Sequence, residues 1–231
     1  LRVEEAPAEL IARVRAEVRG IYGAPKTFFA LKHMGVRTSM KRAAKRESAE
    51  DLVKRKFSAE GPNMAWFADI ACVKTLQGWL YLALVMDIWS RRIVRWAMGP
   101  SITAELADEA LKMALARRNN PKGCVHHSDH GAQYVSLLLS KTMREHEIRP
   151  SMGSISSPWD NAAMESLMGI VKSECVHARV YATRDEAALD IFERIEVVYN
   201  RARIHSALGY MSPAEFEEAN WPDDGGRPRA A

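Results

Sequence analysis

Three carboxylates in unrelated sequence contexts have the types and spacing that metal-dependent phosphoryl chemistry needs. Asp69, Asp129 and Glu165 lie in three unrelated sequence motifs, and 35 residues stand between the last two (165 − 129 − 1). Carboxylate oxygens converging from separate elements can hold two divalent ions roughly 3.5–4 Å apart. Such a pair clamps the attacking and leaving oxygens of an in-line displacement. The set therefore predicts an enzyme that cuts and rejoins DNA strands.

An uneven distribution of positive charge points to an anionic partner. The 231 residues carry 33 Lys and Arg against 29 Asp and Glu, a net charge of +4. Residues 1–50 hold 11 of these cations and 6 of the anions, or +5, so the remainder is close to −1. A basic arm ahead of a nearly neutral domain can attract phosphate without neutralising carboxylate metal ligands. With 47% hydrophobic residues, the chain is expected to fold around a core.

The cysteines and the apolar runs indicate the compartment. Cys72, Cys124 and Cys175 are odd in number and far apart, which favours a reducing environment over a disulfide scaffold or a cysteine-rich zinc site. No signal peptide is visible, and the longest apolar run, 79–86, is far below the roughly 20 residues that span a bilayer. We therefore expect a soluble intracellular protein with no membrane partner. The first residue, Leu1 rather than Met, indicates a frameshift product or a fragment of a longer reading frame.

Residues 1–56 are predicted to form a small basic helical segment and linker. Residues 8–20 place apolar side chains on one face of a helix, and a second helix follows over about 26–34. The Gly-Pro turn at 22–25 joins them, and 37–56 is a further helix or a linker. This helix-turn-helix-like outline suggests a DNA-binding unit. An ordinary helical hairpin with a solvated charged face is the alternative on spacing alone.

The hydrophobic period changes from residue 64 onward to that of strands. Residues 65–73, 78–86 and 92–98 are rich in β-formers and separated by short turns, which predicts a three-stranded meander. Residues 124–128 predict a short buried strand, and 147–152 a last one. The fold class predicted is α/β, with a mixed five-stranded sheet flanked by helices.

Helices are predicted around and after the later strands. They cover about 103–118, 136–146, 159–174 and 183–200, with Thr103 and Thr183 as N-caps. Small residues at 153–158 predict a loop before the third of these helices.

These elements place the three carboxylates where they can meet. Asp69 falls in mid-strand among apolar neighbours, where an unpaired carboxylate is costly. Asp129 follows the fourth strand at its carboxyl end, where α/β folds place ligands. Glu165 lies on a helix whose same face carries Asn161 and Lys172. The carboxylates converge if the first and fourth strands are neighbours under this helix. Each of these carboxylates taken alone is more often a solvated or paired charge. Their order along the chain and the motifs around them favour a metal site.

Six stretches carry the motifs that identify a family resemblance. They are Trp66-Phe-Ala-Asp69-Ile, Tyr81 to Asp87-x-x-Ser-Arg-Arg92, His127-Ser-Asp-His-Gly-Ala-Gln-Tyr134, Ser151-Met-Gly-Ser154, Asp160-Asn-Ala-Ala-Met-Glu165-Ser and Tyr199-Asn200 to Ser-Pro213. Together they resemble the second-reading-frame (OrfB-type) transposase of bacterial insertion sequences over about residues 8–218. That group shares the retroviral-integrase catalytic core, which has an RNase H-like fold. The turn at 22–25 also resembles the helix-turn-helix segment that precedes this core.

The resemblance implies a DDE transposase in which Asp69 bridges two divalent ions, Asp129 holds one and Glu165 the other. The ions would be Mg²⁺, with Mn²⁺ as a substitute. One ion lowers the pKa of a water or a DNA 3′-hydroxyl while the other stabilises the leaving oxygen, so no Ser or Tyr nucleophile is needed. The implied partners are DNA (terminal repeats and target), further copies of the chain, and an upstream reading-frame partner or fusion. The implied location is the bacterial cytoplasm, at the nucleoid.

Further residues are candidates for contacts with DNA. Lys172, on the same helix face as the glutamate, is expected to contact phosphates, with Asn161 close by. Trp159, beside the serine-rich loop, is a candidate for stacking on an exposed base. Arg203 and His205 are expected either to touch DNA or to cap the fold.

A second group of residues is expected to support the site. His127, Gln133 and Tyr134 either shape it or serve local packing. His126, His127 and His130 superficially suggest a zinc cluster, but adjacent residues of a strand face opposite sides, which disfavours it.

Two departures from the family pattern affect the functional expectation. Ala68 and Ala71 stand where the family has Thr on both sides of Asp-Ile, and the helical segment starts late. The expected domains are residues 1–56, an integrase core over 57–218 and a disordered tail over 219–231. The alternatives to an active transposase are a catalytically impaired DNA-binding remnant of a mobile element and an RNase H-like nuclease.

Overall fold

A computed structural model shows the chain as two compact units, Leu1–Ser48 and Ala49–Ala231. The residues that it describes are 30–33, 51–53, 58–152, 169, 172–173 and 180–222. Of the first unit only 30–33 are described, and they are helical, within the helix predicted over 26–34. The helix predicted over 8–20 lies outside the described residues.

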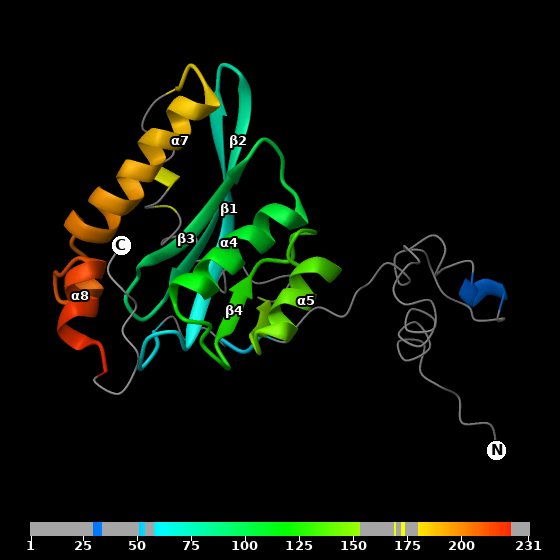
Figure 1. The fold of residues 1–231 in the computed structure, drawn as a ribbon, viewed down its shortest axis with the longest axis horizontal. Coiled ribbons are helices and arrows are strands. Elements are labelled where there is room, and N and C mark those ends of the chain that lie inside the picture. Colours follow the sequence, from blue (N-terminus) through cyan, green and yellow to red (C-terminus); the bar gives the residue numbers. More distant parts are fainter. Residues whose placement is uncertain are drawn as a thin grey trace. The chain divides into compact units, whose positions relative to one another are not determined.

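The second unit is built on a five-stranded mixed sheet with the order β3-β2-β1-β4-β5 (Figure 1). β1, β2 and β3 form the predicted antiparallel meander, and β4 and β5 add to the other side of β1 in parallel. The strands are β1 Ala65–Thr75, β2 Gly78–Asp87, β3 Ile93–Gly99, β4 Val125–Ser128 and β5 Arg149–Met152. The predicted mixed sheet with flanking helices is confirmed.

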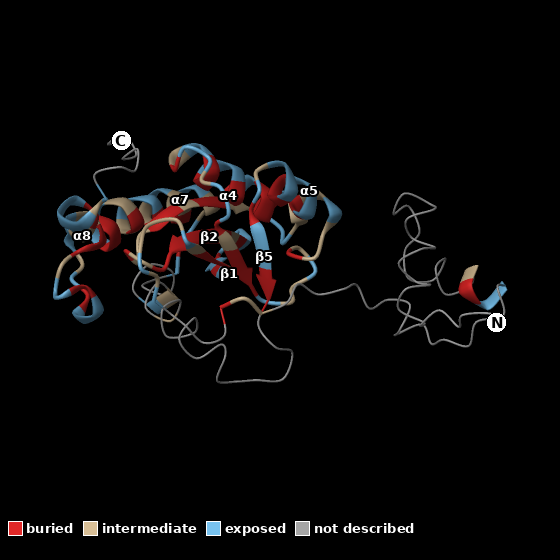
Figure 2. Cartoon of the chain, turned by 90° about the horizontal axis from the view of Figure 1, so that it is seen from below, coloured by how far each residue is buried: buried red, intermediate tan, exposed pale blue. Residues whose placement is uncertain are grey.

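Helices cover both faces of this sheet. α4 (Ala104–Arg117) and α5 (Leu137–Glu145) lie on one face, and α7 (Arg184–Glu193) with the π-helix η2 (Arg194–Ala202) lies on the other (Figure 1). Side chains of β1 alternate between two cores because successive strand residues point to opposite faces. Trp66 and Ala68 pack with α4 and α5, whereas Phe67 and Ala71 pack with α7 and η2. The sheet is consequently buried from both sides (Figure 2).

Side-chain caps fix where the helices begin. Thr103 and Ser136 accept the backbone N–H of Leu106 and Leu139, each at 3.2 Å, and Thr183 accepts that of Glu186 at 3.0 Å. An N-cap hydroxyl satisfies one of the amides that a helix leaves without a partner in its first turn. The predicted helix starts at Thr103, Ser136 and Thr183 are confirmed, and the helix predicted from residue 159 begins outside the described residues.

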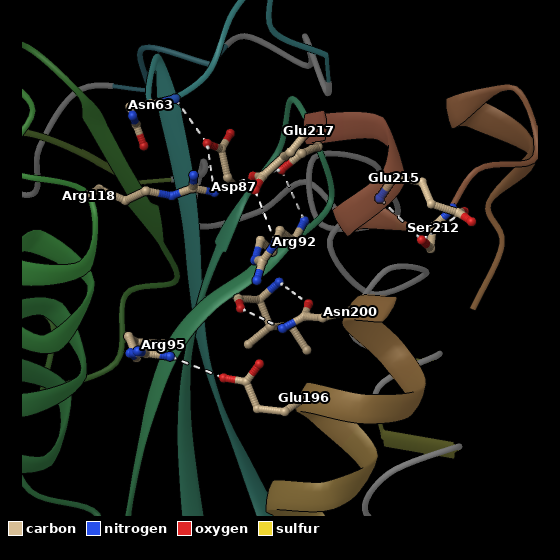
Figure 3. Close-up of polar contacts among 12 residues, drawn as sticks. Asn63, Asp87, Arg92, Arg95, Arg118, Glu196, Asn200, Ser212, Glu215 and Glu217 are labelled. Atoms are coloured by element: carbon tan, nitrogen blue, oxygen red, sulfur yellow. Dashed lines mark hydrogen bonds and ion pairs between the residues drawn. The ribbon is translucent and has the colours of Figure 1, made fainter. Parts of the chain in front are cut away.

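The last predicted helix differs from the structure in its winding. One α-helix was expected over 183–200, but it continues from Arg194 to Ala202 as a π-helix. Tyr199 and Asn200, consecutive in sequence, are both buried there. The Asn200 side chain receives the N–H of Ile93 and donates to its carbonyl, both at 3.0 Å (Figure 3). A hydrophobic pattern does not report such a contact, because it depends on an edge strand about a hundred residues away.

The boundaries of the ordered core also differ from expectation. α8 runs Pro213–Asn220, and Trp221 packs edge-on against Trp89 with ring centroids 5.8 Å apart. The tail predicted from residue 219 is therefore wrong for 219–221, because Trp221 finds an aromatic partner on the core. At the other end Val53 is buried, and the N–H of Leu52 donates to Ser151 Oγ at 2.9 Å. Part of the predicted arm thus belongs to the second unit, Ala49–Ala231.

A buried charge network joins α8 to the sheet and to the end of α4 (Figure 3). Glu217 accepts from Ser90 Oγ at 2.7 Å and from Arg92 Nη1 at 3.2 Å, and it pairs with Arg118. Arg118 also lies 3.8 Å from Asp87, and its side chain is 2% exposed. Breaking a buried pair by removing one partner typically costs about 3–5 kcal/mol. The motif residues 87–92 therefore hold the C-terminal helix in place.

Asp87 is the fully buried member of this network. Its two oxygens accept the backbone N–H groups of Asn63 at 2.9 Å and Trp89 at 3.1 Å. Burial raises the pKa of its carboxyl to about 6, although Arg118 and the two amides oppose the shift. A carboxyl whose pKa is raised on folding stabilises the fold below its ordinary value of 3.8, and this stability is lost as the pH rises through 6.

This titration predicts a pH-dependent effect of Asp87→Asn. Residue 87 of the variant cannot titrate. The unfolding free energy of wild type minus that of the variant should therefore be largest near pH 4 and fall by roughly 1–3 kcal/mol by pH 7. Denaturant unfolding across this window measures it. A difference that stays constant with pH would show that Asp87 keeps an ordinary pKa in the fold.

Candidate catalytic site

Asp69 lies where β1 loses its neighbour on one side. The parallel ladder between β1 and β4 pairs Phe67 with His127, and β4 ends one residue later at Ser128. Asp69 shares its side of the sheet with Phe67 and Ala71, the side of α7 and η2. Its Oδ1 accepts the N–H of Ile70 at 2.8 Å. The carboxylate is thus partly buried at a notch in the sheet, not deep in a closed core.

Asp129 follows β4 in an adjacent position. It lies two residues after His127, as Asp69 lies two residues after Phe67, on parallel neighbouring strands. Its Oδ1 accepts the N–H of Gly131 at 2.8 Å, and the residue is otherwise exposed. The expectation that the first and fourth strands are neighbours is confirmed, and it places both aspartates just past the end of the β1–β4 ladder, Asp69 still within β1 and Asp129 after β4.

Tyr134 lies within the electrostatic field of both aspartates. Burial, followed by the charges of Asp69 and Asp129, raises the pKa of its phenol well above the ordinary value of 10. The residue is 3% exposed, and its Oη has no hydrogen-bond partner among the described residues. A buried hydroxyl without a partner is uncommon and calls for an explanation. At neutral pH the phenol therefore stays protonated.

Lys172 supplies a cation directly at Asp69. Its Nζ lies 3.1 Å from Asp69 Oδ2, and the side chains are 39% and 24% exposed. The ion pair places Lys172, seven residues after Glu165 in the sequence, beside Asp69. Glu165 itself, with Asn161 and Trp159, lies outside the described residues, so the convergence of all three carboxylates stays a prediction.

The supporting residues have defined places around the aspartates. His127 packs against Phe67 with ring centroids 5.1 Å apart, and its Nδ1 lies 2.9 Å from Ser151 Oγ. The Gln133 side-chain amide covers Gly131, where an added Cβ would stand 2.2 Å from its Nε2. Glycine at 131 therefore lets the loop after Asp129 fold tightly.

The two adjacent histidines of β4 face opposite sides of the sheet, as strand alternation predicts. His126 faces Tyr134 on one side of the sheet, and His127 faces Phe67 on the other. Burial, with a smaller contribution from His127, lowers the pKa of His126 to about 4, so its ring is neutral at physiological pH. In the described part of the chain, no three His, Cys, Asp or Glu side chains are grouped so as to hold a metal ion.

The C-terminal candidates for DNA contact are mostly part of the fold. His205 is 5% exposed and packs edge-on against Tyr199 at 5.3 Å. Arg203 Nη1 lies 3.3 Å from the His205 ring. Of the two expectations for this pair, capping the fold is the one that the burial of His205 favours, because a buried imidazole has little surface to offer a phosphate.

Ser151 is a site-supporting residue that sequence reasoning missed. It is 1% exposed and joins the His127 ring to the backbone of Leu52. Its signal was available in the motif at 151–154, but only the parallel pairing of β4 with β5, His127 opposite Ser151, shows what it contacts.

The fold and the position of the aspartates define the class of an integrase catalytic core. Two family models, each described as "Integrase core domain", match residues 59–158 and 146–213, together more than half of the chain. The chain belongs to the integrase core domain family.

Known proteins with similar sequences include an insertion-sequence transposase. The chain is 42% identical over 172 residues to "Transposase InsF for insertion sequence IS3A" of Escherichia coli (strain K12), which covers 74% of this chain and 60% of that protein. It is 42% identical over 170 residues to "Insertion element IS600 uncharacterized 31 kDa protein" of Shigella sonnei, covering 74% and 62%. The chain thus spans about three fifths of the length of these relatives.

Solved structures share the fold at low sequence identity. A chain of the simian T-cell lymphotropic virus intasome in complex with PP2A regulatory subunit B56 gamma matches with a TM-score of 0.58 at 15% identity, covering 96% of this chain and 78% of that one. The HTLV-2 integrase catalytic core domain in complex with magnesium (trimeric form) matches at 0.51 and 14%, covering 68% and 98%. These matches confirm the predicted RNase H-like fold. In the described part of the chain, no helix has the length and apolarity to cross a membrane.

The orphaned hydroxyl of Tyr134 generates a prediction. Tyr134→Phe should leave the free energy of unfolding unchanged or raise it by up to about 1 kcal/mol, because an unpaired buried hydroxyl is removed. If the hydroxyl serves the site, metal-dependent strand cleavage should fall about tenfold or more. Denaturant unfolding and a nicking assay measure the two effects. Tyr199→Phe, at a buried tyrosine of η2, is the control, and an equal loss of cleavage there would assign Tyr134 to packing.

Proposed function

We propose that this chain is the catalytic part of an insertion-sequence transposase, a DDE polynucleotidyl transferase that cleaves DNA strands at element ends and joins them to target DNA. The observation that carries the proposal is the position of Asp69 and Asp129 just beyond the end of the parallel ladder between β1 and β4, in a chain of the integrase core domain family. The 42% identity to an insertion-sequence transposase supports the substrate class.

The donor set suits divalent ions. Two carboxylates lie at the same end of the β1–β4 ladder, and a cationic group already lies against Asp69 Oδ2. We propose that Asp69, Asp129 and Glu165 hold two Mg²⁺ ions, for which Mn²⁺ would substitute, because hard oxygen ligands suit both. A structural neighbour is described as a complex with magnesium. Once bound, the ions would supply an activated water or 3′-hydroxyl and would stabilise the leaving oxygen.

The chain's own groups would position the DNA and the ligands. Tyr134, kept protonated, would donate its Oη–H toward the aspartate end of the site. Ser151 and Phe67 hold the His127 ring beside the β1–β4 ladder, which keeps the two aspartates in register. In this mechanism DNA supplies its own 3′-hydroxyl, so no side chain is needed as a covalent nucleophile.

The DNA contacts and the assembly are part of the same proposal. Lys172 would bind a phosphate near the cut, with Asn161 and Trp159 close to it in sequence. Arg203 would add a weaker contact at the surface. The transposase would act as an oligomer on its terminal repeats, with an upstream reading-frame product as a partner or fused segment, in the bacterial cytoplasm.

Neither alternative function gains support from the two alanines beside Asp69. Ala68 is 3% exposed in the core with α4 and α5, and Ala71 is 1% exposed in the opposite core. Both methyl groups lie among apolar side chains, so their exchange for Thr alters packing and leaves the carboxylate set intact. The proposal therefore keeps an active enzyme over an impaired remnant.

Replacing the carboxylates tests the catalytic proposal. Asp69→Asn, Asp129→Asn and Glu165→Gln should each lower metal-dependent cleavage and strand transfer about a thousandfold or more, because a metal ligand is lost. DNA affinity should remain within a few fold of wild type, since binding depends on phosphate contacts. Gel assays with labelled terminal repeats and Mg²⁺ measure both. Equal losses of binding and cleavage would instead assign the residue to folding.

Deleting the basic arm tests whether the arm supplies DNA affinity while the rest of the chain supplies catalysis. The deletion should cover residues 1–48, not the predicted 1–56, because Leu52 and Val53 belong to the catalytic unit. DNA affinity should fall most at low salt, where counterion release contributes most. Metal-dependent nicking by residues 49–231 should survive. If the shortened protein binds terminal repeats as tightly as the whole chain, recognition lies in the core or in a partner chain.

A further inference from the structure

The two oxygens of Asp69 have different partners. Oδ1 accepts the N–H of Ile70 at 2.8 Å, and Oδ2 receives the ammonium of Lys172 at 3.1 Å. The amide is part of the strand and stays in place, whereas the ammonium is carried by a flexible four-carbon stem. Oδ2 is therefore the oxygen whose partner can be exchanged.

A divalent ion and the ammonium compete for this oxygen. Mg²⁺ binds carboxylate oxygens at about 2.0–2.1 Å, so an ion on Oδ2 would lie within a few ångström of Lys172 Nζ at its present position. Two cations at this separation repel strongly in a partly buried site. Binding of the ion at Oδ2 therefore requires the ammonium to move away.

We propose that Lys172 is the counter-ion of Asp69 in the metal-free protein, and that metal binding releases it to a DNA phosphate. The inference deepens the proposed function and rests on it. In the metal-free state the ammonium offsets the charge of a carboxylate that is only 24% exposed. In the metal-bound state the same ammonium is free to bind phosphate, so metal and DNA each favour binding of the other.

The Lys172–Asp69 pair has the properties that such an exchange needs. Both side chains are partly exposed, and ion pairs of this kind contribute little stability. The contrast within this chain is Arg118, which is 2% exposed and pairs with two carboxylates. A guanidinium held in that way cannot leave without exposing a buried charge. Lys172 can leave at low cost, because solvent and phosphate both accept it.

The first part of the proposal is that the Lys172 ammonium competes with a metal ion for Asp69. Mn²⁺ titration of the full chain without DNA, followed by electron paramagnetic resonance, tests it. Lys172→Met removes the competing charge and should tighten Mn²⁺ binding about two- to fivefold. Lys172→Arg keeps the charge and should not tighten it. Lys112→Met is the control, because it breaks another lysine–aspartate pair, between the exposed Lys112 Nζ and the buried Asp108 Oδ2 at 2.7 Å, and should leave Mn²⁺ affinity unchanged. Unchanged or weaker Mn²⁺ binding by Lys172→Met overturns the inference.

Binding of a short DNA duplex with and without Ca²⁺ tests the second half. Ca²⁺ should raise the duplex affinity of wild type by a factor about two to five times larger than that of Lys172→Met. The same Ca²⁺ effect in both proteins overturns the release to phosphate. Asp69→Asn separates this inference from the proposed function. If that variant binds Mn²⁺ as wild type does, the proposed metal site itself is wrong, whatever Lys172 does.

Discussion

The site depends first on the parallel pairing of β1 with β4. This ladder is short, from Ala65 with Val125 to Phe67 with His127, and β1 continues beyond it for eight residues, to Thr75. Because β4 stops, Asp69 is paired with no described strand on one side, whereas β2 is a continuous antiparallel partner on the other. A carboxylate in the middle of a fully paired strand would be buried and costly. The end of β4 is what makes a mid-strand aspartate available for chemistry.

The C-terminal helices depend on a second constraint, the pairing of buried charges. Asp87, Arg118 and Glu217 come from β2, the end of α4 and α8, and Arg118 pairs with both carboxylates (Figure 3). Asn200 adds a two-way contact to the backbone of β3. These contacts fix the C-terminal part of the chain against the sheet. Charges therefore serve two purposes in this protein: buried ones orient helices, and the partly exposed pair at Asp69 remains exchangeable.

Local sequence signals were sufficient for most elements and insufficient for some boundaries. Strand alternation and the caps at Thr103 and Thr183 predicted the meander and the helix starts, because both depend on residues close together in the chain. The π-helix, α8 with Trp221, and the attachment of Leu52 and Val53 to the second unit were missed. Each of these is decided by a distant partner: Ile93 for Asn200, Trp89 for Trp221, and Ser151 for Leu52.

By itself, the sequence was enough to predict Asp69 and Asp129 as site residues, to order the strands along the chain and to supply the family motifs. Only the tertiary structure decided which of the motif residues face the site and which hold the fold. Residues 87–92 and His205 belong to buried packing, and Lys172 lies at a carboxylate where phosphate was expected. The physical reason is that a motif preserves residue types, whereas burial and pairing depend on segments about a hundred residues apart that meet only in the folded chain.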